Sequence, residues 1–237
     1  MAIFKQILTK EQAKIINEWL DEDQDGWSKK AVTGPSNPSI KHCQEYSGKY
    51  LEKIQRNIFE SLDKSSSWLS YTVYPKQSSE IIINRYKEGN FYREHLDTNH
   101  NSPLGAFHYS NTLFISDPKN YEGGELVLVK DEEEISYKLN PGDLIAYPTG
   151  TPHRVENVKK GIRYSIVFWT ESYITNVYDR DKIRLLYKSY KQLSDLVHGL
   201  PPHKMDQAST LYRTMSSVEE AIISKYHVQR QQKNDES

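Results

Sequence analysis

Between Trp68 and Glu171 the chain consists of short runs of β-branched and aromatic residues, separated by turn-forming residues. Many short strands at such spacing are typical of sheets that form a β-sandwich or barrel. This segment therefore predicts a mainly β core. The expected strands cover 69–74, 80–86, 107–115, 125–130, 135–139, 143–147 and 162–170.

Helical patterns flank this β segment. Thr9 and Gln12 have the spacing of a capping box, and an apolar stripe follows them. A second helix is expected over 44–62, after a loop over 28–42 that is rich in Ser, Gly and Pro. Such helices would bury the outer face of one sheet, giving an α+β architecture.

Helical periodicity returns after Tyr173 and continues to Val197. The Gly199-Leu200-Pro201-Pro202 segment interrupts it, and another helix is expected over 206–226. We therefore predict a domain over 1–175 with its β core at about 68–171, a C-terminal helical extension over 176–229, and a disordered tail over 230–237.

Composition and charge disfavour several classes of protein. The formal net charge is −1 and the pI is near 6.7, with scattered basic residues, so no basic patch for nucleic acid is expected. Cys43 is the only cysteine, which rules out a disulfide within the chain and fits a reducing compartment. The N-terminus lacks a signal-peptide pattern, and no apolar run has membrane length. A soluble, cytoplasmic protein without a nucleic-acid or membrane partner is expected; its oligomeric state stays open.

His95, Asp97 and His153 form the pattern that points to chemistry. Residues i and i+2 of an extended strand project to the same face, so His95 and Asp97 can bind one ion. His153 must come from another strand that packs opposite. Two imidazoles and one carboxylate can occupy one face of an octahedral metal and leave three adjacent positions open, as in non-haem Fe(II) oxygenases. A single His-x-Asp is weak evidence among eight histidines, so the surrounding motifs decide.

Four motifs occur in order along the chain around these residues. They are the segments 86–97, 121–126, 139–148 and 163–169. With them, the chain resembles the 2-oxoglutarate-dependent Fe(II) dioxygenases of the prolyl-4-hydroxylase superfamily, and it is most similar to the PKHD-type hydroxylases. The likeness is strongest over 80–171 and continues more loosely through 27–41 and the C-terminal helices.

The resemblance implies a double-stranded β-helix, which is a distorted jelly roll, with helices packed on one outer face. It implies Fe(II) as the metal, 2-oxoglutarate and O2 as cosubstrates, and L-ascorbate as a reductant. Gly123-Gly124 and Pro141-Gly142-Asp143 are expected to be architectural, because glycine permits the positive φ angles of tight turns.

Arg163, Ser165 and Tyr86 are the expected cosubstrate-binding residues. Arg163 lies in an otherwise apolar strand, where an unpaired charge is costly to bury, so a carboxylate partner is expected. In the family, the basic residue at the matching position holds the far carboxylate of 2-oxoglutarate. Ser165 lies on the same strand face and can add a hydroxyl donor. Tyr86 matches a family tyrosine that reaches the cosubstrate near the metal; the strand register of Thr112 is left open.

Three more residues are candidates for contact with the substrate. Trp169 falls where prolyl hydroxylases carry a tryptophan near the active site, although core packing explains a strand tryptophan equally well. Gly34 and Pro35 lie in the 28–42 loop, whose family counterpart lies at the mouth of the active site. The loop is therefore a candidate lid, with a plain connector as the alternative. His100 and His108 are expected to be ordinary histidines, with a substrate contact as the alternative for His108.

The resemblance implies oxidation of a C–H bond to C–OH while 2-oxoglutarate becomes succinate and CO2. The implied substrate is a prolyl residue of a peptide or protein, but fold-level analogy is a weak warrant for a substrate. Hydroxylation of a free amino acid or another small molecule is the first alternative. A nucleobase is disfavoured, because no basic stripe interleaved with aromatic residues is present. A non-catalytic jelly roll that binds metal as a sensor is the alternative from another class, but it would not need Arg163 and Ser165.

Overall fold

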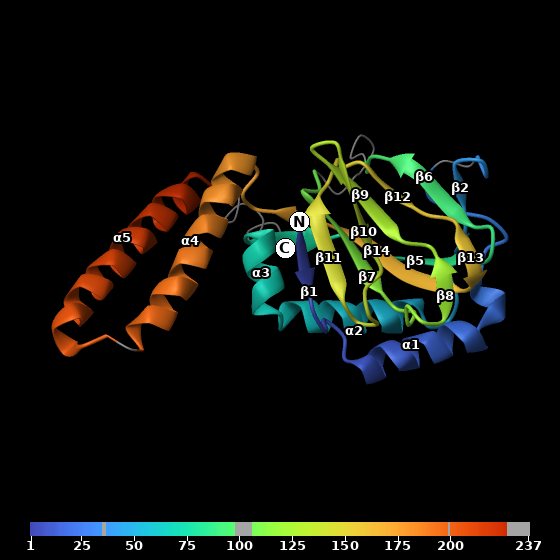
Figure 1. Cartoon of the computed structure of the whole chain (residues 1–237), viewed down its shortest axis with the longest axis horizontal. Coiled ribbons are helices and arrows are strands. Elements are labelled where there is room, and N and C mark those ends of the chain that lie inside the picture. The colour runs from blue at the N-terminus through green and yellow to red at the C-terminus, as the bar shows by residue number, and fades with distance from the viewer. Residues whose placement is uncertain (35–36, 98–105, 199, 227–237) are drawn as a thin grey trace, which may run out of the picture. The chain divides into compact units, whose positions relative to one another are not determined.

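The computed structural model describes residues 1–34, 37–97, 106–198 and 200–226 (Figure 1). It divides into two compact units. The first comprises Met1–Trp68 and Gln77–Glu171, and the second comprises Leu69–Lys76 and the chain from Ser172 onward. The boundary between a domain over 1–175 and an extension over 176–229 stays a prediction, and the tail expected over 230–237 lies outside the described residues.

The larger sheet has seven strands. Its order is β1 (Ala2–Phe4), β11 (Leu144–Pro148), β7 (Tyr109–Phe114), β14 (Arg163–Ser172), β5 (Ile82–Tyr86) and β3 (Gln44–Glu45), and β4 (Pro75–Ser78) pairs with β14. Neighbours along this path are antiparallel. All six residues of β7 are buried, because β7 lies in the middle of the sheet and both of its faces are covered.

A second sheet faces the first. It contains β10 (Glu133–Tyr137), β9 (Leu126–Lys130), β12 (His153–Val155), β6 (Phe91–His95) and β2 (Lys41–His42), and a separate pair joins β13 (Val158–Gly161) to β8 (Tyr121–Gly123). Apolar side chains of both sheets meet in one core cluster of Phe114, Leu126, Leu128, Ile145 and Tyr147. The predicted mainly β, jelly-roll core is therefore confirmed.

Two helices cover the seven-stranded sheet (Figure 1). Helix α1 (Lys10–Glu22) begins with the predicted capping box, in which Thr9 and Gln12 bond each other's backbone N–H. It reaches the sheet through Asn17, which donates to the carbonyl of Ile115 at 2.7 Å. Helix α2 (Leu51–Asp63) lies along the same sheet, where the rings of Phe59 and Phe168 meet edge to face at 5.8 Å. A short 3-10 turn, η1 (Gln24–Gly26), follows α1.

Three predicted elements are corrected. The strand expected over 69–74 is wrong, because Ser66–Thr72 forms helix α3; the Oγ of Ser65 accepts the N–H of Trp68 and can cap its first turn. The helix expected over 44–62 starts seven residues later, at Leu51, because 44–45 pair with β5 as strand β3. The loop expected over 28–42 ends in strand β2, which pairs with β6. Strand pairing at a distance overrides local pattern in the last two cases.

The turn before β11 requires its glycine. Gly142 has a φ of +85°, and a Cβ there would lie 2.0 Å from the carbonyl oxygen of Leu8. The neighbouring Asp143 carboxylate accepts the backbone N–H of Gln6 at 3.0 Å and the ammonium of Lys5 at 2.9 Å. The expected architectural role of Pro141-Gly142-Asp143 is thus to join the N-terminal segment to β11.

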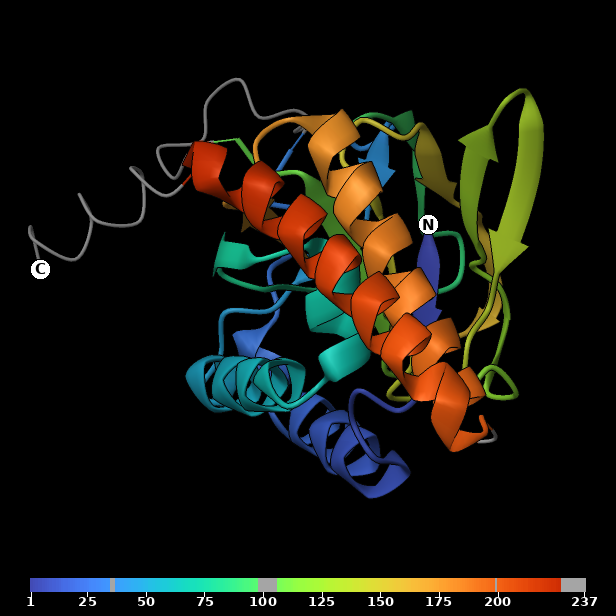
Figure 2. The same ribbon diagram turned by 90° about the vertical axis from the view of Figure 1, so that its left-hand side faces the viewer.

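The second unit contains two long helices, α4 (Val177–Val197) and α5 (Met205–Ile223), which lie side by side (Figure 2). The side chain of Asn176 caps α4 by accepting the N–H groups of Tyr178 and Asp179. Short 3-10 turns, η2 (Pro202–Lys204) and η3 (Ser224–Tyr226), flank α5. The core of this second unit consists of Val73, Ile174, Ile183, Ile222 and Ile223. Among the described residues, neither of these helices nor any other is long and apolar enough to cross a membrane.

Candidate metal centre and cosubstrate cavity

His95 and His153 come from neighbouring strands of one sheet. Their Cα atoms are direct partners in the antiparallel pairing of β6 with β12. His153 therefore lies beside His95 rather than on a strand packed opposite, which corrects that expectation. Strand β6 ends at His95, and Asp97 lies two residues beyond it.

The three side chains converge on one point. Each offers one ligand atom, and these atoms all lie within 4.8 Å of one another. The Nε2 of His95 is 3.9 Å from Oδ1 of Asp97, and the Nε2 of His153 is 3.7 Å from Oδ2 of the same carboxylate. The convergence thus brings two imidazole nitrogens and one carboxylate together from separate parts of the chain.

Backbone carbonyls orient both imidazoles. The Nδ1 of His95 lies 2.8 Å from the carbonyl oxygen of Arg93, and the Nδ1 of His153 lies 2.9 Å from that of Thr151. A carbonyl oxygen can only accept, so when either ring is in its neutral form Nδ1 carries the proton and Nε2 presents its lone pair. Histidines that bind metals are commonly held in this way.

Three neighbours shape the centre further. Burial, and next the neighbouring His153, lower the pKa of His95 to about 4, so its ring is neutral at pH 7. The hydroxyl of Ser110 donates to Oδ2 of Asp97 at 2.6 Å and orients the carboxylate. The ring of Tyr92 stacks on that of His95, with centroids 3.6 Å apart and planes 17° apart.

A cavity of about 910 Å³ extends from this centre to Arg163. It lies between the two sheets, because its wall includes residues of β5, β7, β11 and β14 from one sheet and of β6, β9 and β12 from the other. All six residues predicted to bind metal or cosubstrate line it, namely Tyr86, His95, Asp97, His153, Arg163 and Ser165. Thr112, whose register was left open, lines it as well.

Arg163 is buried in this wall with most of its hydrogen-bonding capacity unused. Its side chain is among the largest fully buried ones, at 1% exposure. Nη1 donates to Oγ of Ser165 at 2.8 Å, whereas Nε and Nη2 have no hydrogen-bond partner among the described residues. The guanidinium lies 5.2 Å from the ring centroid of Tyr86 and 5.5 Å from that of Phe114. Such a group is complementary to a carboxylate, which a guanidinium can bind through two N–H groups.

Tyr86 faces Arg163 across the pairing of β5 with β14, where the two residues are Cα partners. Burial raises the pKa of Tyr86 well above its usual range, so the hydroxyl stays protonated. Gly124 lies behind the arginine, and a Cβ there would come within 3.1 Å of Cδ of Arg163.

The residues expected near the substrate have different positions. Trp169 and Gly34 line the cavity, and Gly34 has a φ of +74°. Pro35 and His100 lie outside the described residues. His108 is not among the residues that line the cavity; its backbone bonds Thr170 and Thr149 instead.

Sequence reasoning missed several residues of the cavity wall. Tyr147 lies with its ring 5.3 Å from that of His153, and its motif was noted without a role for the side chain. Ser110 alternates with Thr112 on β7, which would have indicated a shared face once the strand register was known. Lys41 and Glu45 also line the cavity, although nothing local in their segment distinguishes them from surface charges.

Comparison with known proteins defines the class. The family model described as the 2OG-Fe(II) oxygenase superfamily matches residues 81–171, the stretch that carries β5 to β14. Together with the fold, this match identifies an oxidoreductase, a 2-oxoglutarate-dependent dioxygenase whose family implies Fe(II), 2-oxoglutarate and O2. A PKHD-type hydroxylase of Crocosphaera subtropica is 34% identical over 66% of this chain and 68% of its own length. Another, from Pseudomonas putida, is 33% identical over 76% of this chain and 82% of its own length.

The chain belongs to the PKHD-type hydroxylases. Among solved structures, a prolyl hydroxylase from Trichoplax adhaerens, in complex with a peptide fragment of the oxygen degradation domain of hypoxia inducible factor, has a similar fold. Its TM-score is 0.52 at 16% identity, over 78% of this chain and 86% of that one. The family, the fold and the class of enzyme predicted from the sequence are thus confirmed.

Proposed function

We propose that the cavity is the active site, in which His95, Asp97 and His153 bind Fe(II) and Arg163 binds the far carboxylate of 2-oxoglutarate. The observation that carries this proposal is that one cavity contains both a convergent set of metal-ligand atoms and a buried guanidinium whose Nε and Nη2 have no hydrogen-bond partner among the described residues. Ser165 lies within hydrogen-bonding distance of that guanidinium and adds a hydroxyl to the same carboxylate subsite.

The residues present suit the group that the family implies. Two imidazoles whose Nε2 atoms converge on one carboxylate form the donor set of non-haem Fe(II) sites. When bound, Fe(II) with 2-oxoglutarate and O2 supplies the oxidation of an unactivated C–H bond. The protein's own contribution is to position the partners and to keep water out. Ser110 orients Asp97, and Tyr86 offers a protonated hydroxyl to the cosubstrate.

We infer that the substrate is a prolyl residue of a peptide or protein. Support comes from the fold shared with a prolyl hydroxylase that was solved with a peptide. The cavity also offers the aromatic side chains of Tyr92, Phe107 and Trp169, which suit a saturated apolar ring. Trp169 and Gly34 are the residues we assign to substrate contact, and L-ascorbate is the reductant that we expect to sustain turnover.

Mass spectrometry of peptides treated with the purified protein tests this function. A peptide library would be incubated with Fe(II), 2-oxoglutarate and L-ascorbate, beside a matched library in which alanine replaces proline. A gain of one oxygen confined to the proline-containing peptides is expected, and Asp97→Ala should abolish it. Conversion of free proline or another small molecule, with no peptide modified, would contradict the peptide substrate. Unchanged turnover by Asp97→Ala would contradict the metal site.

A further inference from the structure

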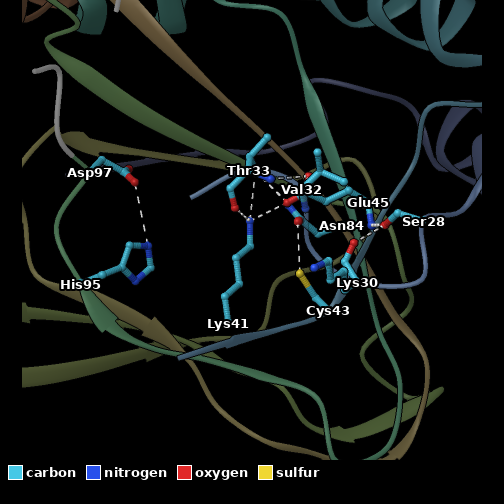
Figure 3. A network of polar contacts seen from close by, with 10 residues as sticks. All are labelled: Ser28, Lys30, Val32, Thr33, Lys41, Cys43, Glu45, Asn84, His95 and Asp97. Atoms are coloured by element: carbon cyan, nitrogen blue, oxygen red, sulfur yellow. Dashed lines mark hydrogen bonds and ion pairs between the residues drawn. The ribbon is translucent and has the colours of Figure 1, made fainter. Parts of the chain in front are cut away.

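A buried network of polar contacts joins Val32 and Thr33 to Lys41 of β2 and Glu45 of β3 (Figure 3). Thr33, Lys41 and Glu45 line the cavity. The ammonium of Lys41 donates to Oε1 of Glu45 at 2.6 Å, and to the carbonyl and hydroxyl oxygens of Thr33 at 3.1 Å each. The exposed fractions of the two charged side chains are only 5% and 8%. All three ammonium hydrogens have acceptors, so the network leaves Lys41 no free donor for a ligand.

Glu45 completes the network from the other side. Its Oε2 accepts the backbone N–H groups of Val32 and Thr33 at 3.1 and 2.9 Å, and its Oε1 accepts the hydroxyl of Thr33 at 2.6 Å. Ser28 adds two hydrogen bonds at the same place: its backbone N–H donates to the carbonyl of Glu45, and its Oγ accepts the backbone N–H of Glu45, each at 2.9 Å. The part of the 28–42 loop that reaches the cavity is therefore held by a buried ion pair.

Lys41 also contacts the metal centre through one aromatic ring. Lys41 and Tyr92 are Cα partners across β2 and β6, and the ammonium lies 5.1 Å from the centroid of the Tyr92 ring. That ring stacks on the imidazole of His95 at 3.6 Å. The hydroxyl of Tyr92 in turn lies beside Gly34, since a Cβ at Gly34 would be 3.1 Å away from it. A continuous path of contacts thus runs from residues 32–34 to His95.

We propose that Lys41 is a positioning residue that sets the orientation of the His95 ring through Tyr92. Glu45 holds the backbone of Val32 and Thr33 beside Lys41. This inference rests on the proposed function, because it takes His95 as a metal ligand. An ammonium whose hydrogens are all bonded cannot shift without breaking a buried ion pair. The ring it attracts is thereby confined, and the imidazole stacked on that ring is confined with it.

Binding of Co²⁺ to the metal-free protein, without cosubstrate, measures this orientation directly. Co²⁺ prefers the same donor set, and its d–d absorption bands report ligand geometry. Lys41→Met should weaken Co²⁺ binding by about threefold, the size expected for the loss of a cation–π contact, and should shift the bands. Lys49→Met is the matched control, because the ammonium of Lys49 lies 4.8 Å from the ring of Tyr50 and pairs with Glu22, away from the cavity. It should change neither quantity.

Two further variants separate positioning from folding. Lys41→Met leaves the Glu45 carboxylate buried without its cation, so Lys41→Met/Glu45→Gln removes both charges and keeps an amide oxygen as acceptor. It should show the same change in Co²⁺ binding with a smaller loss of thermal stability. Adding Tyr92→Leu to it should weaken binding no further, because the path is already broken. If Tyr92→Leu instead lowers the Co²⁺ affinity by the same factor in the wild type and in the Lys41→Met/Glu45→Gln protein, Lys41 does not act through Tyr92.

The outcomes also distinguish this inference from the function on which it rests. Asp97→Ala should abolish Co²⁺ binding at the centre; binding that equals the wild type would overturn the proposed metal site. If Asp97→Ala abolishes binding while the Lys41→Met/Glu45→Gln protein keeps the wild-type affinity and absorption bands, the metal site stands. Lys41 is then a structural residue only, and the proposal is wrong.

Discussion

Arg154 on the outer face of β12 and Arg163 in the wall of the cavity differ in the partners of their guanidinium groups. Arg154 is partly exposed, yet its guanidinium donates to Glu156 at 2.6 Å and to both carboxylate oxygens of Glu134 at 2.8 and 2.6 Å. Arg163 is buried, and its Nη1 donates to the neutral hydroxyl of Ser165. Among the described residues, no carboxylate accepts a hydrogen bond from its Nε or Nη2.

This difference has a physical reason. A surface arginine can exchange a missing partner for water, whereas a buried guanidinium with unused N–H groups carries an uncompensated desolvation cost. An anion from outside the chain would offset this cost. The contrast therefore separates charges that are paired within the sheet from the charge that we propose binds a ligand, and four experiments test it.

The largest effect is expected from Arg163→Leu. The variant lacks one partner of a buried, charge-assisted carboxylate pair, and such a loss typically costs on the order of 2–5 kcal/mol. The affinity for 2-oxoglutarate should fall at least tenfold while Mn²⁺ binding changes little. Calorimetric titration of the Mn²⁺-loaded protein measures both, with Arg154→Leu as the matched arginine control. Equal cosubstrate affinity in the wild type and Arg163→Leu would show that Arg163 does not bind a carboxylate of 2-oxoglutarate.

As the pH falls, the stability that depends on His95 in the cavity should be lost before the stability that depends on the Arg154–Glu134 pair on the outer face. The folded-state pKa of His95 is about 4, below its ordinary 6.5. The unfolded chain therefore takes up more protons between pH 6.5 and 4, and the metal-free protein should lose on the order of 2–3 kcal/mol across that window. Arg154 lowers the pKa of Glu134, so the stability from that pair is present above the ordinary glutamate pKa of 4.5 and is lost below it.

Thermal unfolding of the metal-free protein at several pH values measures this order. His95→Asn should flatten the dependence between pH 6.5 and 4, and Glu134→Gln should leave that window unchanged. If Glu134→Gln rather than His95→Asn removes the pH dependence of stability between pH 6.5 and 4, the titrating group is on the outer face and not in the cavity.

A smaller effect is expected from Ser165→Ala. Its hydroxyl accepts a hydrogen bond from Nη1 of Arg163 at 2.8 Å, and one neutral hydrogen bond contributes about 1 kcal/mol. The affinity for 2-oxoglutarate should fall about fivefold, with metal affinity unchanged. Ser165→Thr keeps the hydroxyl and should restore most of the affinity. Equal affinity in the wild type and the alanine variant would remove Ser165 from the carboxylate subsite.

The smallest effect is expected from Arg154→Leu. Exposed ion pairs contribute about 0–1 kcal/mol even when the geometry is good, because water and salt screen them. The melting temperature of the variant should be lower by a few degrees or less. Added salt should change the melting temperature of the wild type more than that of the variant. A loss of 2-oxoglutarate affinity comparable to that of Arg163→Leu would end the distinction between the two arginines.

Local sequence patterns predicted much of this molecule. The capping box at Thr9 and most of the strands follow from the periodicity and turn residues of short segments. Arg163 was identified as a residue that needs a partner, because a charge in an apolar strand is costly wherever the strand lies. The segment 69–74 shows the limit of such patterns, since its aromatic and β-branched residues suit a strand, yet Ser66–Thr72 is helical.

From the sequence alone follow a His-x-Asp pair, a remote histidine and an arginine in an apolar strand, in an order that carries the family likeness. Which residues support them depends on the tertiary structure. The register of β6 with β12 places His153 beside His95, and that of β2 with β6 places Lys41 against Tyr92. Pairing across a sheet joins residues far apart in the chain, and a shift of one residue would turn every side chain to the other face. That information is a property of the assembled sheets and is absent from any single segment.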